Sequence, residues 1–488
     1  MRQPFKTEPD LTLTPIEKII IPLHSRDELP PILMGLQWIW RHPTLKTAIL
    51  ALLETKVMAD KKITGRWGLD LWQILVLGVV RLGLDANYDR LEDLANHHTL
   101  IRQMLGVAQT PWGEGVKVFN HQTLRDNVAL VDEALLQEIN ALVAAAGRDV
   151  FKKKADGPAE PLVLKADTYV LETDVHFPTD LNLLFDAGRK GVDLIEKYRD
   201  QLHYDLPGWR KLEDWRRRFK AAERQASKVV FGGGKDKDRR VKAAVSHYVE
   251  VGQGLCAKLT ASLLSLCDQP VELSHWEALA YFQHMLDKHL DLVDRRLLQD
   301  QSIPAAEKVY SLFEPHTEWI TKGKLHPSVE LGHRLLIATD QHGLIQDYAS
   351  PTGVDVDQSV PVADRLLGRY GVGQIASISF DKGFTRAADR ELLELYIPTV
   401  VMPKRGRKNQ AETEREKSRE FVTLRQAHSA VESDINALEH HGLNRCLDVG
   451  LAGFERYVGY GVLAFNLHQI GRELLERQRK GLPIAVAA

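Results

Sequence analysis

Three acidic residues of this sequence stand in contexts typical of metal-dependent chemistry. Asp167 lies within an apolar run, LVLKADTYVLE, and Asp381 directly follows a second run, QIASISF. Glu432 lies near the start of a helical pattern, AVESDINALEHHG. Soluble proteins rarely bury carboxylates without a partner. Two strand-end aspartates and a helix-borne glutamate can converge on a pair of divalent cations, an arrangement suited to phosphodiester chemistry.

Each of the three acids also has a purely structural interpretation. Asp167 and Asp381 can be turn or capping residues, because Asp side chains readily hydrogen-bond the nearby backbone. Glu432 can be a solvated position on a helix. The structural interpretation weakens when the acids are taken together, since three such placements in one topology seldom arise by chance.

Other polar residues near the first apolar run compete for a metal-binding role. Asp174 lies seven residues after Asp167, so in one continuous strand it faces the opposite side. Asp180 is expected to be the N-cap of the helix that begins with LNLLF. Asp340 is expected at a hairpin turn, and His176 is expected to be structural.

Length and composition restrict the class of protein. The chain has 488 residues, of which 44% are hydrophobic and 27% charged, and its net charge is −2. These values are typical of a soluble protein of two or three domains, in which nucleic-acid binding depends on local basic clusters. The three cysteines have neither metal-ligand nor disulfide-framework spacing. We therefore expect a protein of the reducing cytoplasm, without a signal peptide or membrane span.

The sequence divides into an arm, a helical region and an interrupted α/β region. Residues 1–30 are typical of an extended N-terminal arm, and 31–150 of an all-α domain that is a candidate for DNA binding. Strand-like residues at 160–185 precede a charged helical region at 186–304, where GGGKDKD predicts a break between two arms of a hairpin insertion. Strand and helix patterns alternate over 305–475, which ends in an amphipathic helix.

Outside the insertion, the elements follow the order β–(insertion)–β–β–α–β–α–β–α. This order predicts an α/β, ribonuclease H-like fold, with a mixed five-stranded sheet, a helical insertion after the first strand and the all-α domain before it. The first and fourth strands are neighbours in that topology, so Asp167 and Asp381 are expected to lie close together. Glu432 then reaches the same place from the helix that follows the fifth strand.

Four motifs, in one order, resemble those of the DDE transposases of bacterial insertion sequences. They are ADTYVLETDVHFPTDLNLL, EWITKGKLHPSVELGHRLLIATDQHGLI, SFDKGF and HSAVESDINALEHHGLNRC. An N-terminal stretch, TGRWGLDLWQILVLGVVRL, also resembles the helical region that precedes the catalytic core of this family. The resemblance covers about residues 60–470. It implies a ribonuclease H-like core that cuts and joins DNA at the ends of an insertion sequence.

The resemblance also implies site residues, cofactors and partners. Asp167, Asp381 and Glu432 take the catalytic and metal-binding roles, with two Mg²⁺ ions, or Mn²⁺ in their place. The substrates are double-stranded DNA, both the terminal inverted repeats of the element and the target. Holding two DNA ends at once implies at least a homodimer, at the nucleoid in a bacterial cytoplasm.

Two positions depart from the family pattern. His428 stands four residues before Glu432, where relatives often have a more basic residue, and Glu439 stands where a lysine is common. These basic residues hold terminal DNA phosphates in the family. Arg445, in GLNRC, fits the pattern, and Arg425 can substitute from the preceding segment.

Basic clusters supply the remaining candidates for DNA contact. Lys404, Arg405, Arg407 and Lys408 follow the fifth predicted strand, beside the expected active site, and we favour DNA binding there. Two clusters in the insertion, at 216–220 and 239–242, can contact DNA or can be solvated helix faces balanced by nearby acids.

Two other functions remain compatible with the sequence. One is a structure-specific nuclease of the same fold that does not transfer strands. The other is a catalytically inactive DNA-binding protein derived from a transposase. The departures at His428 and Glu439 keep the inactive protein open, whereas the presence of all three acids favours the active enzyme.

Overall fold

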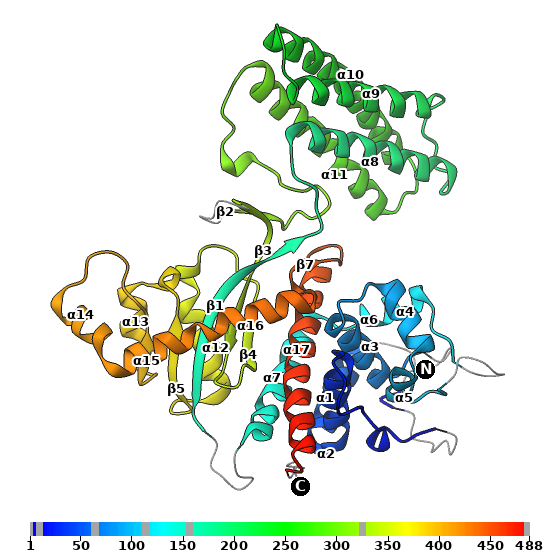
Figure 1. Ribbon diagram of the computed structural model, residues 1–488. Helices are drawn as coiled ribbons and strands as arrows, with labels where there is room; N and C mark the ends of the chain where they lie inside the picture. Colours follow the sequence, from blue (N-terminus) through cyan, green and yellow to red (C-terminus); the bar gives the residue numbers. More distant parts are fainter. Residues whose placement is uncertain are drawn as a thin grey trace. The chain divides into compact units, whose positions relative to one another are not determined.

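The structure is a computed structural model that describes residues 3–5, 13–59, 68–109, 117–152, 160–321 and 328–482 (Figure 1). The chain forms two compact units. One unit is made of 1–174 and 320–488, and the other of 175–319. The fold is α/β and 61% helical, with a mixed sheet that does not close into a barrel.

The sheet has seven strands in the described part of the chain, rather than the five expected. Its main order is β2–β3–β1–β5–β6, with β4 paired to β3 and β7 paired to β1. β1 is antiparallel to β3 and parallel to β5, which is itself parallel to β6. The strands are β1 (Leu162–Thr173), β2 (Glu318–Thr321), β3 (Val329–Thr339), β4 (Ile345–Ala349), β5 (Ile375–Phe380), β6 (Thr399–Val401) and β7 (Arg445–Cys446). The two strands that the sequence did not predict, β2 and β7, are short.

Alternation along β1 separates two hydrophobic cores. Leu164 and Ala166 pack with α12 (Ser359–Tyr370) on one face, whereas Tyr169 and Leu171 belong to the core on the other face. Successive side chains of a strand point to opposite faces, so one strand serves both cores. Asp167 lies two residues before Tyr169 and therefore faces the same side of the sheet as Tyr169 and Leu171.

The N-terminal helices share that second core with the sheet. These helices are α1 (Leu29–Arg41), α2 (Pro43–Val57), α3 (Leu71–Gly83), α4 (Tyr88–His97), α5 (Thr99–Met104), α6 (His121–Val128) and α7 (Glu133–Gly147). They pack with α17 (Leu451–Arg479) in the same compact unit as the strands. The separate all-α domain predicted over 31–150 is therefore not observed.

The described part of the expected N-terminal arm also joins this core. Ile16, Ile19 and Ile21 are buried against it, and the side chain of Gln37 donates to the carbonyl oxygens of Ile16 and Ile19. The rest of the predicted arm, 1–2 and 6–12, lies outside the described residues. Burial of these isoleucines contradicts a freely extended arm over the described stretch.

Helices α1 and α17 approach closely because glycines face backbone at their contact. A Cβ atom on Gly35 would lie 2.4 Å from the carbonyl oxygen of Leu467, and one on Gly471 would lie 1.8 Å from that of Pro31. The middle of α17, from Tyr457 to His468, is buried at every position. This helix is therefore enclosed on all sides there, rather than amphipathic as predicted.

The insertion is longer than predicted and contains four helices. The unit spans 175–319, not 186–304, and holds α8 (Asp180–Asp200), α9 (Leu212–Val230), α10 (Lys237–Cys267) and α11 (Leu273–Val293). It has its own core, which includes Leu184, Phe219 and Leu255. The predicted glycine break lies between α9 and α10, but α8 and α11 complete a bundle that a two-armed hairpin lacks.

The remaining elements of the first unit lead from β4 back to α17. A short helix, Asp355–Asp357, precedes α12, and another, Lys382–Phe384, follows β5. Next come α13 (Ala387–Leu393), β6, α14 (Gln410–Lys417), α15 (Arg419–His428), α16 (Ala430–Leu438) and the segment Glu439–Leu443. Among the described residues, every helix is too short or too polar to cross a membrane.

Candidate active site

Asp167 and Asp381 lie on neighbouring parallel strands and face the same side of the sheet. Ala166 of β1 is in register with Phe380 of β5, and the two aspartates are the next residues along. The backbone of Asp381 stays extended, with φ −68° and ψ 167°. Because Ala166 and Phe380 both enter the α12 core, the aspartates face the opposite side. The expected adjacency of these two strands is confirmed.

Glu432 reaches this side of the sheet from α16, which contacts β1 and crosses it in Figure 1. It lies in the first turn of the helix, with an exposed side chain. Its negative charge raises the pKa of both Asp167 and His428. The three acids that the sequence singled out therefore lie in one electrostatic neighbourhood.

The surroundings of Asp167 disfavour its charged form. Its pKa is raised from 3.8 to about 6, mainly by burial and also by the charges of Asp381, Asp355 and Glu432, against a hydrogen bond from the backbone N–H of Thr168. Desolvation and like charges both disfavour a carboxylate. The site would therefore gain from a bound cation.

Oxygens of Asp167, Asp381 and Glu432 do not all approach one another within 4.8 Å. In the described part of the chain, that condition is met only by another group, Glu28 with His441 and His468. The three acids are thus gathered but more widely spaced than the ligands of a single ion. Carboxylate oxygens are the ligands that Mg²⁺ prefers, and waters can complete its coordination.

Asp355 is a fourth acid at the site and was not predicted from the sequence. One of its oxygens accepts a hydrogen bond from the Thr168 hydroxyl at 2.9 Å, and the Arg334 side chain lies 3.7 Å away. A Cβ atom on Gly383 would lie 3.3 Å from its other oxygen, which places Asp355 beside the turn after Asp381. Its only sequence signal is VDVD in a loop, where acids are common.

His428 lies at the site in a neutral state. Burial lowers its pKa, although Asp381 and Glu432 raise it, and Lys165 lowers it further. Its Nδ1 lies 3.0 Å from the Ser379 hydroxyl. Because that hydroxyl donates to the carbonyl oxygen of Leu164, it can accept from Nδ1–H, which leaves Nε2 unprotonated.

Lys165 is a buried lysine on the same strand as Asp167, and the sequence analysis did not predict it as part of the site either. It has the same parity on β1 as Asp167 and is 6% exposed. Its charge lowers the pKa of Asp434 on α16, which burial raises, and lowers that of His428. Lys165 is not among the causes of the shifted Asp167 pKa. Its charge therefore acts on the Asp434 side of α16.

The six candidate DNA-binding residues divide into two groups. Lys404 pairs with Glu412 at 2.7 Å, Lys408 with Glu416 at 2.5 Å, and Arg445 with Asp174 at 2.5 Å. The other three, Arg405, Arg407 and Arg425, are exposed and have no ion-pair partner among the residues described.

Arg405 lies beside the turn that follows Asp381. One of its terminal nitrogens lies 3.7 Å from the point where a Cβ on Gly383 would stand, two residues after Asp381. An anion held there would lie beside the strand end. This position makes Arg405 a candidate phosphate ligand.

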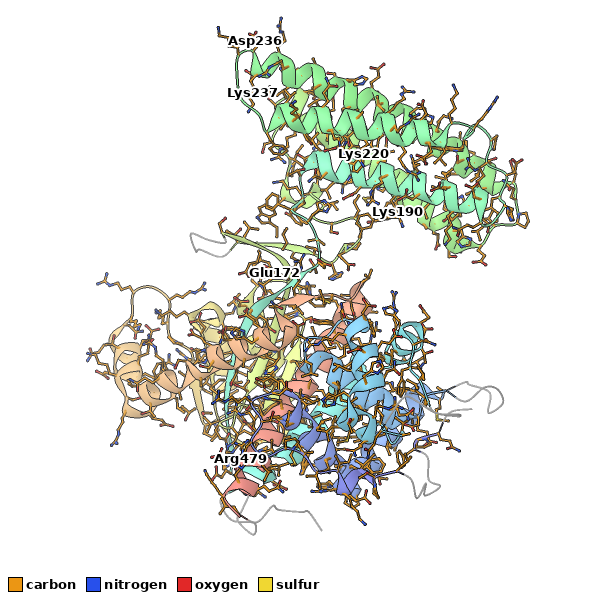
Figure 2. All side chains as sticks on the ribbon, turned by 45° about the vertical axis from the view of Figure 1, so that its right-hand side comes forward. Glu172, Lys190, Lys220, Asp236, Lys237 and Arg479 are labelled. Atoms are coloured by element: carbon orange, nitrogen blue, oxygen red, sulfur yellow. The ribbon has the colours of Figure 1, made fainter. Side chains whose placement is uncertain are left out.

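Two of the basic residues in the cluster at 216–220 are paired with acids of the insertion. Arg216 contacts Asp193 and Glu196 at 3.0 and 2.9 Å, and Arg217 contacts Asp214 at 3.3 Å. Figure 2 shows charged side chains over the helices of this unit, with Lys190, Lys220 and Lys237 labelled. The pairs favour the solvated-face interpretation for Arg216 and Arg217, whereas Arg218 and Lys220 have no ion-pair partner among the described residues.

The other polar residues that could compete for a metal-binding role have structural partners. Asp340 accepts from the backbone N–H groups of His342 and Leu344, as expected at a hairpin turn. Asp180 is the first residue of α8 and pairs with Arg296, while the N-cap is Thr179, so the prediction that Asp180 caps the helix was wrong. His176 lies 3.2 Å from Asp186.

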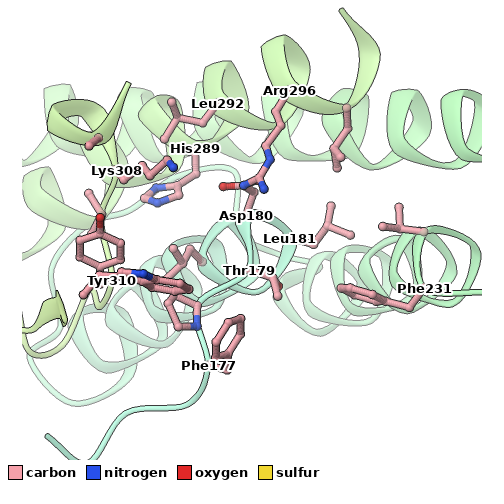
Figure 3. Close-up of a pocket in the computed structure, with 17 residues that line it drawn as sticks. Phe177, Thr179, Asp180, Leu181, Phe231, His289, Leu292, Arg296, Lys308 and Tyr310 are labelled. Carbon is pink, nitrogen blue, oxygen red and sulfur yellow. The ribbon is translucent and has the colours of Figure 1, made fainter. Parts of the chain in front are cut away.

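A separate cavity of about 600 Å³ lies within the insertion unit (Figure 3). Phe177 and Tyr310 contribute aromatic walls, and Arg296, which is paired with Asp180 at 2.7 Å, contributes a charge. His289 is fully buried there, and burial lowers its pKa. The cavity shares no residue with the acidic site on the sheet.

Comparisons with known proteins add no assignment. No family model matches the chain, and no similar curated protein or solved structure was found.

Proposed function

We propose that this protein is a metal-dependent DNA transposase that cuts the ends of an insertion sequence and joins them to target DNA. The observation that carries the proposal is the gathering of Asp167, Asp381 and Glu432 on one side of the sheet, with repulsion among their carboxylates. The resemblance of the four motifs to DDE transposases supports the same assignment.

The arrangement of the strands supports a ribonuclease H-like core. Five of them lie in the order β4–β3–β1–β5–β6, in which β3 is antiparallel to its neighbours and β5 and β6 are parallel to β1. The helical insertion follows β1, as the sequence predicts for this fold.

Asp167, Asp381 and Glu432 would hold the Mg²⁺ or Mn²⁺ ions, and Asp355 is a further candidate. The donor set fits, because it consists of carboxylates and because burial and neighbouring carboxylates raise the pKa of Asp167, which a bound cation would oppose. Two such ions activate a nucleophile and stabilise the leaving oxygen in phosphodiester cleavage.

The residues of the chain would orient the DNA and set the charge of the site. Arg405, Arg407 and Arg425 are free to contact phosphates, and each contact would contribute a salt dependence of about −0.9 in log–log slope. Neutral His428 adds no charge next to Asp381 and Glu432. Two DNA ends held at once would require at least a dimer of this chain.

Replacement of Asp381 by Asn tests this function. With DNA that carries the terminal inverted repeats flanking the coding region, and with Mg²⁺, we expect Asp381→Asn to reduce cleavage by about 10³-fold or more while DNA binding is retained. Asp364→Asn, at an exposed aspartate of α12, is the matched control and should cleave like the unaltered protein.

The outcomes of the same assay separate the alternatives. Cleavage without joining by the unaltered protein indicates a nuclease. Binding without cleavage, with or without Mg²⁺, indicates an inactive derivative. Cleavage retained by Asp381→Asn removes Asp381 from the site.

A further inference from the structure

A second cluster of metal-ligating side chains lies away from the acidic site. Glu28 is the residue before α1, His441 lies in the segment Glu439–Leu443, and His468 lies on α17. One ligand atom from each lies within 4.8 Å of the other two. Nε2 of His468 is 2.7 Å from Oε2 of Glu28, and Nε2 of His441 is 4.0 Å from the same oxygen.

Hydrogen bonding and burial leave both imidazoles ready to act as ligands. Nδ1 of His441 lies 3.3 Å from the carbonyl oxygen of Gly83. A carbonyl only accepts, so Nδ1 carries the proton and the lone pair is on Nε2, which faces Glu28. The pKa of His468 is lowered to about 4, mainly by burial and also by the charges of His441 and Arg472, against an opposing effect of Glu28. His441 therefore offers the lone pair of Nε2 towards Glu28, and burial favours the neutral, metal-binding form of His468.

The backbone around His441 is fixed by its surroundings. Gly442 has φ +90°, and a Cβ atom there would lie 2.7 Å from a carboxylate oxygen of Asp85. The Tyr457 hydroxyl donates to the carbonyl oxygen of Gly442 at 3.0 Å. Two of the three donors, His441 and His468, thus stand on rigid elements, which lowers the entropy lost when a ligand binds.

Distances within the cluster suit a transition metal. Bonds of about 2.0–2.2 Å in tetrahedral geometry separate ligand atoms by about 3.3 Å. The observed separations of 2.7 and 4.0 Å fall on either side of that value. Glu28 is 55% exposed, so a fourth position can be taken by water. Imidazole suits zinc and its neighbours, whereas Mg²⁺ prefers oxygen ligands.

We propose that Glu28, His441 and His468 form a binding site for a divalent transition metal of the zinc class, separate from the acidic site. The site joins three elements that are distant in sequence. Because Glu439–Leu443 continues directly from α16, a bound ion would hold the end of the helix that carries Glu432 against α1 and α17. The site does not depend on DNA or on the function proposed above.

A simpler interpretation is a hydrogen bond between Glu28 and His468 alone. That contact needs neither a metal nor His441. The two interpretations therefore differ in the effect of replacing His441 and in the response to zinc.

Zinc titration of the metal-stripped full-length protein, by calorimetry in excess Mg²⁺, tests the proposal. We expect one tight site in the unaltered protein and binding weakened by about 100-fold or more in Glu28→Gln and in His441→Asn. His440→Asn, which removes the exposed neighbouring histidine, is the matched control and should bind like the unaltered protein. Zinc should raise Tm in the unaltered protein and the control only.

Two results would overturn the proposal. One is the absence of a tight zinc site in the unaltered protein. The other is equal zinc binding by all four proteins, which would place the ion on other histidines or cysteines. Tm values of the metal-free variants establish that each is folded, so that loss of binding is read as loss of a ligand.

Discussion

Two charged sites in the same compact unit, one buried and one partly open to solvent, have opposite electrostatics. Arg81 and Asp448 are 2% and 8% exposed and form two hydrogen bonds, at 2.5 and 2.9 Å, with Arg81 also lying over the Tyr88 ring. Within the described part of the chain, Asp167 forms no ion pair and lies near three further acids, Asp355, Asp381 and Glu432. The first site is complete within the chain. The second lowers its free energy only when protons or external cations bind, which is typical of a functional site.

Loss of Asp448 should have the largest effect. Asp448→Asn leaves the Arg81 guanidinium buried without its counter-charge, so we expect the free energy of unfolding to fall by about 3–5 kcal/mol. Chemical denaturation measures this, with Mg²⁺ and without. A loss below about 1 kcal/mol would show that water or the Tyr88 ring compensates the charge.

Loss of the Asp167 charge should have the opposite sign. Asp167→Asn removes a disfavoured carboxylate but can still accept from the Thr168 N–H, so we expect the metal-free protein to gain about 1–3 kcal/mol at pH 7.5. Activity should be lost in the same variant. A destabilised Asp167→Asn would mean that an unseen cation already balances the site.

The pH dependence should distinguish the sites further. The pKa of Asp167 is raised in the folded state to about 6 from 3.8, so its contribution to stability is greatest below about pH 4 and falls as pH rises through about 6. Stabilisation by Mg²⁺ should therefore be larger at pH 7.5 than at pH 5, measured as the change in Tm. An equal change at both values would argue that Mg²⁺ does not bind at Asp167.

The arginine prediction is the smallest. Arg405→Ala should weaken DNA binding only about two- to fivefold and reduce the salt slope by about 0.9, because one phosphate contact is lost. Lys408→Ala, at a residue paired with Glu416, should change the slope less. Titrations at several salt concentrations measure both, and equal slopes for the two variants would remove the distinction between paired and unpaired residues.

Local patterns predicted the placement of the three acids better than the residues that surround them. Asp167, Asp381 and Glu432 could be placed because strand order puts β1 beside β5 and because a helix follows β6. Asp355 and Lys165 could not, since a loop acid and a lysine within a strand carry no periodic signal. Their roles depend on contacts between distant segments.

The domain division failed for a related reason. Helical periodicity identifies α1, α3 and α7 but not their partner, and α17 supplies that partner from the other end of the described chain. The available signal was the stretch from Tyr457 to Leu467, which has no Asp, Glu, Lys or Arg, because a helix covered on one side only would carry charged residues on its other face. The insertion was placed correctly after β1, but α8 was assigned in part to the catalytic region.

The close packing of α1 against α17 has a consequence for folding during synthesis. During synthesis α1 is made long before α17. The apolar face of α1 that packs against α17 therefore stays exposed until nearly all later segments have been translated. Contacts between segments so far apart in the sequence form slowly, and the intermediates expose apolar surface and are prone to aggregate. Truncation within α17 should therefore destabilise the packing of the N-terminal helices more than that of the strands that carry the acids.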